Sequence, residues 1–276
     1  MAEYLAKSED LTAVADAIRA KGGTDAQLTF PSGFVGAVQA ISAGTTITDG
    51  IVVKARDAEG YATEVDFYGT VVQKYQFGQG SNNTVGFMRL KKVNYKNACT
   101  TIKEGAFANS GKNSESPAPI PETLTEIEAR AFRSSQYISA ELPISLTGRL
   151  PDNLFSENTV IKTIKAPGIT SLDTLGGTGN GQFLKCTGLE NCEIGSIGYG
   201  VTYCETWNFK DCTQSGLTIT VYTNGAYADT AVANIRNGAT NATIIIKAAE
   251  ATTYNGTAYA AGDTIVTSTV GTEGAT

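Results

Sequence analysis

Evenly spaced phenylalanines constrain the fold of this chain more than any other feature of its sequence. The rings recur at intervals of 25, 23, 28 and 26 residues, at Phe107, Phe132, Phe155, Phe183 and Phe209. A unit of this length cannot bury its apolar face alone and must stack on its neighbours, so the period indicates a solenoid. We therefore predict that the five rings lie at the same height in successive coils and form one aromatic column.

The residues around each phenylalanine define the repeat. An aliphatic residue stands five positions before the ring in the two clearest copies, at Ile102 and Ile127, and the third copy keeps the pattern with Leu150. We expect these aliphatic side chains to form the wall that faces the column. A small residue follows three positions after the ring, where the chain is expected to turn back: Ser110, Ser135, Asn158, Cys186 and Cys212.

The composition limits the class of protein and its partners. The chain has 276 residues, of which 41% are hydrophobic and only 17% charged, and its 30 glycines indicate a turn-rich, largely β fold. The net charge of -6 gives no attraction to nucleic acid or to anionic membranes, so we expect neither as a partner. No apolar stretch is long enough for membrane insertion, and the first residues lack the pattern of an export signal.

The five cysteines fit neither a disulfide framework nor a zinc site, because their number is odd and no Cys-x-x-Cys pair occurs. Cys186 and Cys212 hold the same repeat position, so neighbouring coils could bring them close. Buried thiols are the simpler interpretation, and whether the two are thiols or paired stays open.

The sequence divides into five segments. Residues 1–45 are predicted to form two short helices with apolar stripes, namely Leu11, Val14 and Ile18 in the first helix and Phe34, Val38 and Ile41 in the second. Residues 46–87 are predicted to form a β-hairpin entry cap, and residues 88–216 the solenoid of about five degenerate coils. Residues 217–248 read as a strand-helix-strand end cap and residues 249–276 as a small β module with a hairpin at Asn255-Gly256. The predicted fold is mainly β with short helices.

Two insertions interrupt the repeats. Residues 111–121 are rich in Ser and Pro, and residues 175–181 are rich in Gly. The second insertion lacks the spacing of a phosphate-binding loop, so a surface loop is expected and no cofactor is predicted.

Nothing in the sequence forms a convincing catalytic group. The chain has no histidine, which removes the usual base for a Ser or Cys nucleophile and the commonest metal ligand. Asp152 and Glu157 flank Phe155 and could act as a carboxylate pair, although charged residues at a solvated turn are the ordinary case. We predict no catalytic, metal or cofactor site and a protein that is not an enzyme.

Two parts of the chain resemble known families. The Ile-x-x-x-Ala-Phe-x-x-Ser frame at 102–110 and 127–135, with the Phe-x-x-Cys endings at 183 and 209, resembles the BspA-like leucine-rich repeats of bacterial surface and phage proteins. This resemblance implies a right-handed coil with short strands on one face and irregular turns on the other. Separately, residues 11–24 and 28–34 are similar to the start of tail-associated proteins encoded by phages of Gram-positive bacteria. That similarity implies a tail fibre or receptor-binding protein located in the virion.

The leading hypothesis is a non-enzymatic virion component. Its N-terminal helices would anchor it to other tail proteins, and its repeats would face a host cell-surface glycan or protein or neighbouring subunits. Tail fibres are commonly trimers, so we expect a homo-oligomer, with a trimer as one form. The aromatic residues Tyr199, Tyr203 and Trp207 are candidate ligand contacts, with packing within the coil as the alternative. Two other functions remain open, a tail depolymerase acting on surface glycans and a bacterial cell-surface adhesin.

Overall fold

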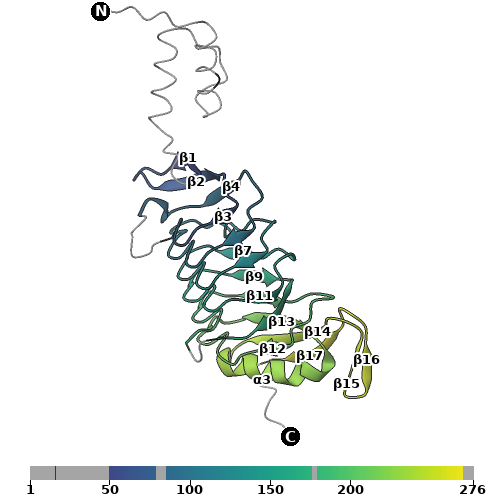
Figure 1. The fold of residues 1–276 in the computed structure, drawn as a ribbon. Coiled ribbons are helices and arrows are strands. Elements are labelled where there is room, and N and C mark those ends of the chain that lie inside the picture. The colour runs from purple at the N-terminus through teal and green to yellow at the C-terminus, as the bar shows by residue number, and fades with distance from the viewer. Residues whose placement is uncertain (1–15, 17–49, 79–84, 176–178, 270–276) are drawn as a thin grey trace, which may run out of the picture.

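The computed structural model describes residue 16 and residues 50–78, 85–175 and 179–269. The described chain winds as stacked coils between β1 (Ile51–Arg56) and β17 (Thr264–Ser268) (Figure 1). The predicted helical segment 1–45 lies outside the described residues except for Asp16, and its apolar stripes Leu11, Val14, Ile18, Phe34, Val38 and Ile41 lie outside them as well. No helix in the described part of the chain has the length and apolar character needed to cross a membrane.

Six coils form the body of the molecule, and each contains a second strand followed by a turn that carries a phenylalanine. Five of the six begin with a first strand. The first strands are β2 (Ala62–Phe67) in coil 1, β4 (Lys92–Tyr95) in coil 2, β7 (Ser139–Glu141) in coil 4, β9 (Thr163–Ala166) in coil 5 and β11 (Asn191–Ile194) in coil 6. The second strands are β3 (Val71–Val72), β5 (Thr101–Ile102), β6 (Glu126–Ile127), β8 (Gly148–Arg149), β10 (Ile169–Leu172) and β12 (Tyr203–Cys204) in coils 1 to 6. A short 3-10 helix, η1 (Val85–Phe87), precedes β4.

Corresponding strands of neighbouring coils pair in parallel. The second strands form two three-stranded sheets, β3-β5-β6 and β8-β10-β12. The first strands of coils 4 to 6 continue into the end of the molecule as the six-stranded sheet β7-β9-β11-β13-β14-β17. Among the residues that the structure describes, coil 3 has no first strand, and an isolated bridge between Pro117 and Ser139 is its only strand-like pairing with β7. The predicted parallel solenoid is therefore present, with one interruption on its first-strand side.

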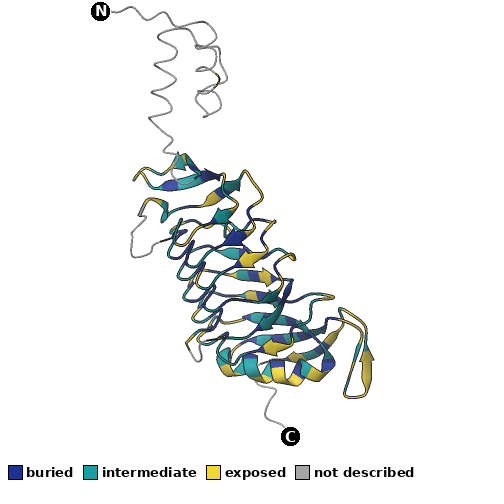
Figure 2. Ribbon diagram, viewed as in Figure 1, coloured by how far each residue is buried: buried dark blue, intermediate teal, exposed yellow. Residues whose placement is uncertain are grey.

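Alternation along the first strands β7, β9 and β11 separates a buried face from an outward one (Figure 2). In β9, Ile164 and Ala166 are buried while Thr163 and Lys165 face outward, and β11 repeats this pattern. Successive side chains of a strand point to opposite faces, so only every second residue needs to be apolar. β-branched residues suit such half-buried positions, which is why Thr, Ile and Val dominate the later strands.

The phenylalanine column is present and contains six rings. The neighbouring centroids from Phe77 to Phe209 lie 5.2, 5.0, 5.6, 6.3 and 4.8 Å apart, and the rings are stacked within 21° of parallel. The rings belong to Phe77, Phe107, Phe132, Phe155, Phe183 and Phe209, all buried. Ile102, Ile127 and Leu150 are also buried. Phe77 adds one coil to the predicted five, because residues 62–77, expected to be part of the entry cap, already form a complete turn.

A hydrogen-bond ladder joins the phenylalanine turns of successive coils. The N–H groups of Arg130, Phe132 and Ser134 donate to the carbonyls of the next coil, at 3.1, 3.0 and 2.8 Å. The same pattern recurs around Phe155, where Glu157 N–H donates to Leu184 C=O at 2.7 Å. The residue two positions after the ring has positive φ in five coils, at Asn109, Ser134, Glu157, Lys185 and Asp211. Every other N–H along the turn therefore points along the stack.

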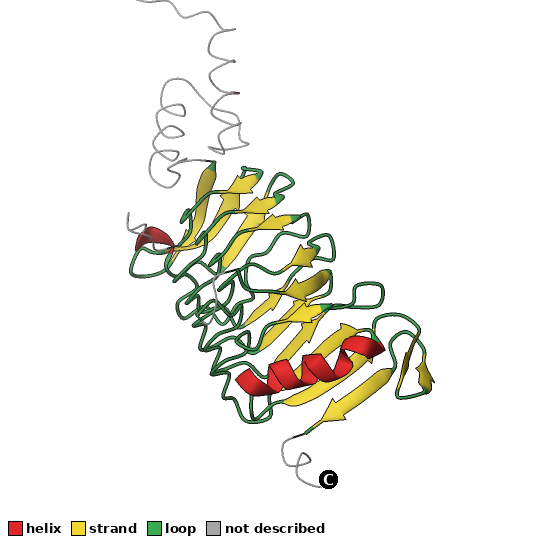
Figure 3. Cartoon of the chain, turned by 60° about the horizontal axis from the view of Figure 1, so that its bottom comes forward, coloured by secondary structure: helices red, strands yellow, loops and turns green. Residues whose placement is uncertain are grey.

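Different elements close the two ends of the stack. At the first end β1 pairs antiparallel with β2. At the far end β13 (Thr218–Thr223) leads through η2 (Gly225–Tyr227) to α3 (Ala228–Gly238) and back into β14 (Thr243–Ala248). Figure 3 shows α3 lying across this end of the solenoid. The chain then forms the hairpin β15 (Thr252–Tyr254) and β16 (Thr257–Tyr259), and β17 pairs antiparallel with β14. The predicted strand-helix-strand unit and hairpin are both present.

Candidate binding surface

The outward side chains of the six-stranded sheet form two straight rows. The pairing register places Ser139, Thr163, Asn191, Thr218 and Thr243 side by side in the first row. It places Glu141, Lys165, Glu193, Thr220 and Ile245 side by side in the second row. We call these two rows the ladder face. Neighbouring strands lie about 4.8 Å apart, so the ladder face presents hydroxyl, amide and charged groups at a regular spacing.

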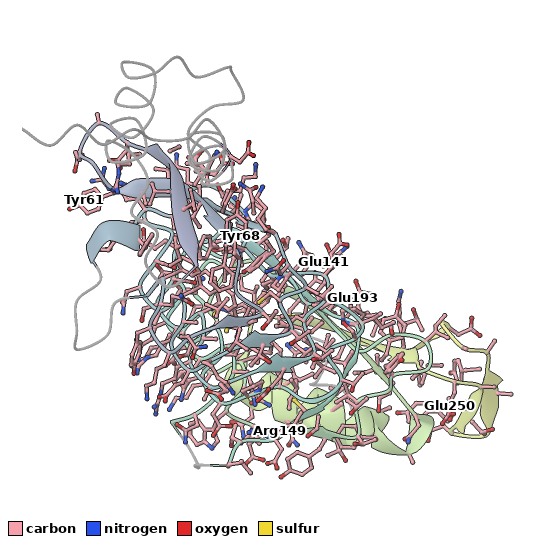
Figure 4. All side chains as sticks on the ribbon, turned by 45° about the horizontal axis from the view of Figure 1, so that its top comes forward. Tyr61, Tyr68, Glu141, Arg149, Glu193 and Glu250 are labelled. Atoms are coloured by element: carbon pink, nitrogen blue, oxygen red, sulfur yellow. The ribbon has the colours of Figure 1, made fainter. Side chains whose placement is uncertain are left out.

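The charges of the ladder face are not used to join the coils. Lys165 stands between Glu141 and Glu193 in the register, and Figure 4 labels both glutamates at the edge of the solenoid. Within the described ranges, none of these three side chains forms an ion pair within 4.0 Å. They are therefore available to a partner.

Elsewhere, charged side chains connect neighbouring coils. Arg133 pairs with Glu157 at 2.9 Å, and its hydrogen bond lowers the pKa of Glu157. Lys103 pairs with Glu128 at 2.8 Å and lowers the pKa of that carboxyl group in the same way. Because each such ion pair joins two coils, these charged side chains stabilise the stack and are not available to bind a ligand.

The two carboxylates considered as a catalytic pair have separate partners. Asp152 accepts a hydrogen bond from Arg149 at 2.6 Å, whereas Glu157 accepts from Arg133 and from Ser134 Oγ. Each is held by an ion pair or hydrogen bond of its own turn or of the adjacent coil. The structure gives both a structural role.

A groove opens beside the first strands where coil 3 lacks one. It has a volume of about 710 Å³ and is lined by residues 117, 118 and 120–122 of coil 3, residues 139–144 of coil 4, and Thr163, Lys165 and Pro167 of coil 5. We call it the coil-3 groove. Its walls are mostly Pro, Ala and Ile, and its floor includes the start of the ladder face. Part of the Ser- and Pro-rich insertion at 111–121 lines this groove, which the sequence pattern does not predict.

The three candidate aromatic contacts do not form one patch. Tyr199 is half-buried, and its backbone pairs with Ser196 in the loop after β11. Tyr203 is 47% exposed and donates from its hydroxyl group to Glu205 at 2.9 Å. Trp207 lies under Lys210, whose Nζ is 4.1 Å from the ring centroid. No ring contact joins any two of the three in the described part of the molecule, so each is a separate candidate.

The cysteines are free, buried thiols, which answers the question left open for Cys186 and Cys212. The two Sγ atoms each lie 3.1 Å from a backbone carbonyl oxygen of the preceding coil, at Phe155 and Phe183, and donate to it. Burial raises the pKa of Cys212 to about 12, and the pKa of Cys204 likewise. Such thiols are poor nucleophiles. No cluster of three metal-binding side chains occurs among the residues that the structure describes.

Comparison with known proteins concerns the repeats. Residues 81–215 match the family model described as a BspA type leucine rich repeat region, in six copies. Searches of curated proteins and of solved structures found no match to the chain. The matched residues include five of the six stacked rings and most of the parallel strands described above. The repeat region of this chain, residues 81–215, is therefore similar to the BspA-type leucine-rich repeats.

Proposed function

We propose that this chain is a non-enzymatic attachment protein whose ladder face binds a macromolecular surface. The observation that carries this proposal is the ladder face itself, a straight array of polar side chains whose charges have no partner in the described chain. Extended repeat surfaces of this kind suit large ligands, because many weak contacts can form at once along a rigid support. A leucine-rich-repeat solenoid is compatible with adhesion or attachment.

The finer proposal is a component of a phage tail fibre or tail tip. It rests on the similarity of residues 11–24 and 28–34 to tail-associated proteins of phages that infect Gram-positive bacteria. In this arrangement the N-terminal segment contacts other virion proteins, and the solenoid faces the host or a neighbouring subunit. Electron microscopy of phage particles labelled with an antibody against residues 85–269 tests the location. Label on bacterial envelopes and none on particles would favour the adhesin instead.

Binding to cells tests the attachment function. The full chain, fluorescently labelled, is mixed with a panel of Gram-positive bacteria and bound protein is counted by flow cytometry. The double variant Thr218→Arg/Thr243→Glu places two bulky, opposite charges on adjacent strands of the ladder face without repelling each other. We expect at least a tenfold loss of cell binding, with no loss in the matched control Thr147→Glu at an exposed corner. Equal binding by both variants would refute the ladder face as the contact surface.

An enzyme assay separates attachment from depolymerisation. Purified envelope glycan from a strain that binds the chain is incubated with it, and released reducing ends are measured. The proposal predicts no release above background. Sustained release that Glu193→Gln abolishes would replace it with a glycan-cleaving function.

A further inference from the structure

The coil-3 groove contains an open section of strand edge. The ladder between coil 3 and β7 begins normally, since Ile138 N–H donates to Ser116 C=O at 3.0 Å and Ala118 N–H donates to Ser139 C=O at 2.7 Å. If the parallel register continued, two more hydrogen bonds would follow. Glu141 N–H would donate to Ala118 C=O, and Ile120 N–H would donate to Glu141 C=O. Instead, Ile120 N–H donates to Ala118 C=O at 2.9 Å, which closes a local turn.

Proline at position 119 enforces this interruption. Pro119 has no N–H to offer to the ladder, and its carbonyl already accepts the Tyr95 hydroxyl at 2.6 Å. The backbone groups of alternate residues along β7 point to the other side and bond to β9 and its flanking residues. For example, Leu142 N–H donates to Lys165 C=O at 2.9 Å. Glu141 N–H and C=O therefore point toward coil 3, where neither finds a backbone partner in the described part of the chain.

The apolar walls of the groove indicate what kind of side chain it accepts. Ile144 is 53% exposed at one wall, and Ile120 is partly exposed at the other. Pro117, Pro143 and Pro167 complete the apolar lining. The lining contains no aromatic ring on which a sugar could stack. An aliphatic side chain fits these walls better than a glycan does.

The charges of the groove indicate the polarity of the ligand. Glu122 and Glu141 are exposed carboxylates in the lining, and Lys165 is the single cation there, which leaves a net charge of -1 from two acids and one base. A ligand with a basic side chain complements this arrangement. The volume of about 710 Å³ lies within the range of about 300 to 1,000 Å³ found for ligand pockets.

We propose that the coil-3 groove binds an extended peptide segment of a partner protein by strand addition. The backbone of the peptide pairs with Glu141 N–H and C=O, an aliphatic residue packs against Ile144 and Ile120, and a Lys or Arg lies beside Glu122 and Glu141. This inference rests on the proposed attachment function and names one class of partner for it. It concerns the coil 3 end of the surface, away from Thr218 and Thr243.

A peptide array tests the proposal. The labelled full chain is applied to immobilised random eight-residue peptides, and the best binders are measured in solution by fluorescence anisotropy. We expect peptides that combine aliphatic and basic residues. Ile144→Ser should weaken their binding at least tenfold, whereas Val160→Ser, which alters an exposed aliphatic residue outside the groove, should leave it unchanged. Glu141→Lys should shift the selected peptides toward acidic residues.

Backbone methylation tests strand addition directly. N-methylation of the central amides of the best peptide removes donors without changing its side chains, and we expect a loss of at least tenfold. The proposal is overturned if the unaltered chain binds no peptide more strongly than the Ile144→Ser variant does. It is also overturned if the N-methylated peptide binds as strongly as the unmethylated one. Binding of envelope glycan that Ile144→Ser abolishes, with no peptide selected, assigns the groove to glycan and also overturns it. Because Thr218→Arg/Thr243→Glu leaves the groove intact, peptide binding by that variant separates this proposal from the ladder-face proposal.

Discussion

Phe132 shows how a single residue holds the stack together. Its ring lies between Phe107 and Phe155, with centroids 5.0 and 5.6 Å away, and it has no exposed surface. Phe132→Ala would leave a cavity in the middle of the column, so we expect a loss of about 3 to 5 kcal/mol in the free energy of unfolding. Urea denaturation followed by circular dichroism measures this loss. Tyr68→Ala, at a ring that is 49% exposed, should change stability by less than about 0.5 kcal/mol. A loss below about 1 kcal/mol for Phe132→Ala would contradict a continuous column.

Lys185 tests the left-handed position of the phenylalanine turn. It has φ 59° and is exposed. A non-glycine residue in this conformation lowers the stability of the folded state by about 1 to 2 kcal/mol. Glycine removes that strain but lowers the stability by about 0.4 to 1 kcal/mol, because it makes the unfolded chain more flexible. We therefore expect Lys185→Gly to raise the free energy of unfolding by about 0.5 to 1 kcal/mol. Lys91→Gly, at an exposed position without positive φ, should lower it, and the same sign for both variants would argue against the turn geometry.

The thiols give a test of burial and of pH dependence. We expect none of the five cysteines to react with a thiol reagent in the folded protein at about pH 8, and all five to react after denaturation. The folded pKa of Cys204 and of Cys212 is about 12, above the unfolded value of about 8.5. Their contribution to stability is thus complete below about pH 8.5 and is lost as the pH rises toward 12. Rapid modification of the native protein would show that the coils open.

At the scale of elements, α3 protects the last second strand. Tyr227 accepts a hydrogen bond from Cys204 N–H through its hydroxyl oxygen, and Asn234 Nδ2 donates to Cys204 C=O at 2.7 Å. Side chains of η2 and α3 thus replace the next coil as partners for the edge of β12. This arrangement is one way in which natural sheets avoid open edges.

Tyr227→Phe removes one of these partners and leaves a buried N–H unsatisfied. We expect a loss of about 1 to 3 kcal/mol and faster hydrogen exchange at the Cys204 amide. Exchange measured by NMR in urea below the transition checks both effects. Tyr203→Phe serves as the control, because the Tyr203 hydroxyl contacts only the exposed Glu205 side chain. Equal exchange in the two variants would show that the Tyr227 hydroxyl does not protect this edge.

At the scale of the whole molecule, a solenoid needs its ends closed. A chain that stops at Gly216 lacks β13, α3, β14 and β17, so it exposes the edge of β11 and the ring of Phe209. We expect this truncated chain to aggregate, as measured by light scattering coupled to size exclusion. Replacing residues 252–259 by Gly-Gly removes only the hairpin β15-β16 and should keep the molecule dispersed. A truncated chain that stays dispersed and unfolds cooperatively would count against the capping role.

Local patterns were enough to predict the column and the far cap. The frame around Phe107 and Phe132 repeats closely, and the apolar positions of α3 follow helical spacing, so both could be identified from neighbouring residues alone. Phe77 was missed because 30 residues separate it from Phe107, although Val72 stands five positions before it as the repeat requires. The left-handed positions were missed because Asn, Ser, Glu, Lys and Asp share no obvious turn signal.

The sequence by itself determined that the chain coils and which side chains fill most of its interior, because those properties depend on the periodic burial of apolar residues. Only the tertiary structure decided which polar groups remain available to a partner. Within the described residues, Lys165 has no ion-pair partner and the N–H and C=O of Glu141 have no backbone partner, because neighbouring coils place none within reach. Arg133 is paired because the next coil places Glu157 beside it. Which side chains and backbone groups of neighbouring coils bond to one another depends on register and distance across the stack, and no local stretch of sequence specifies these.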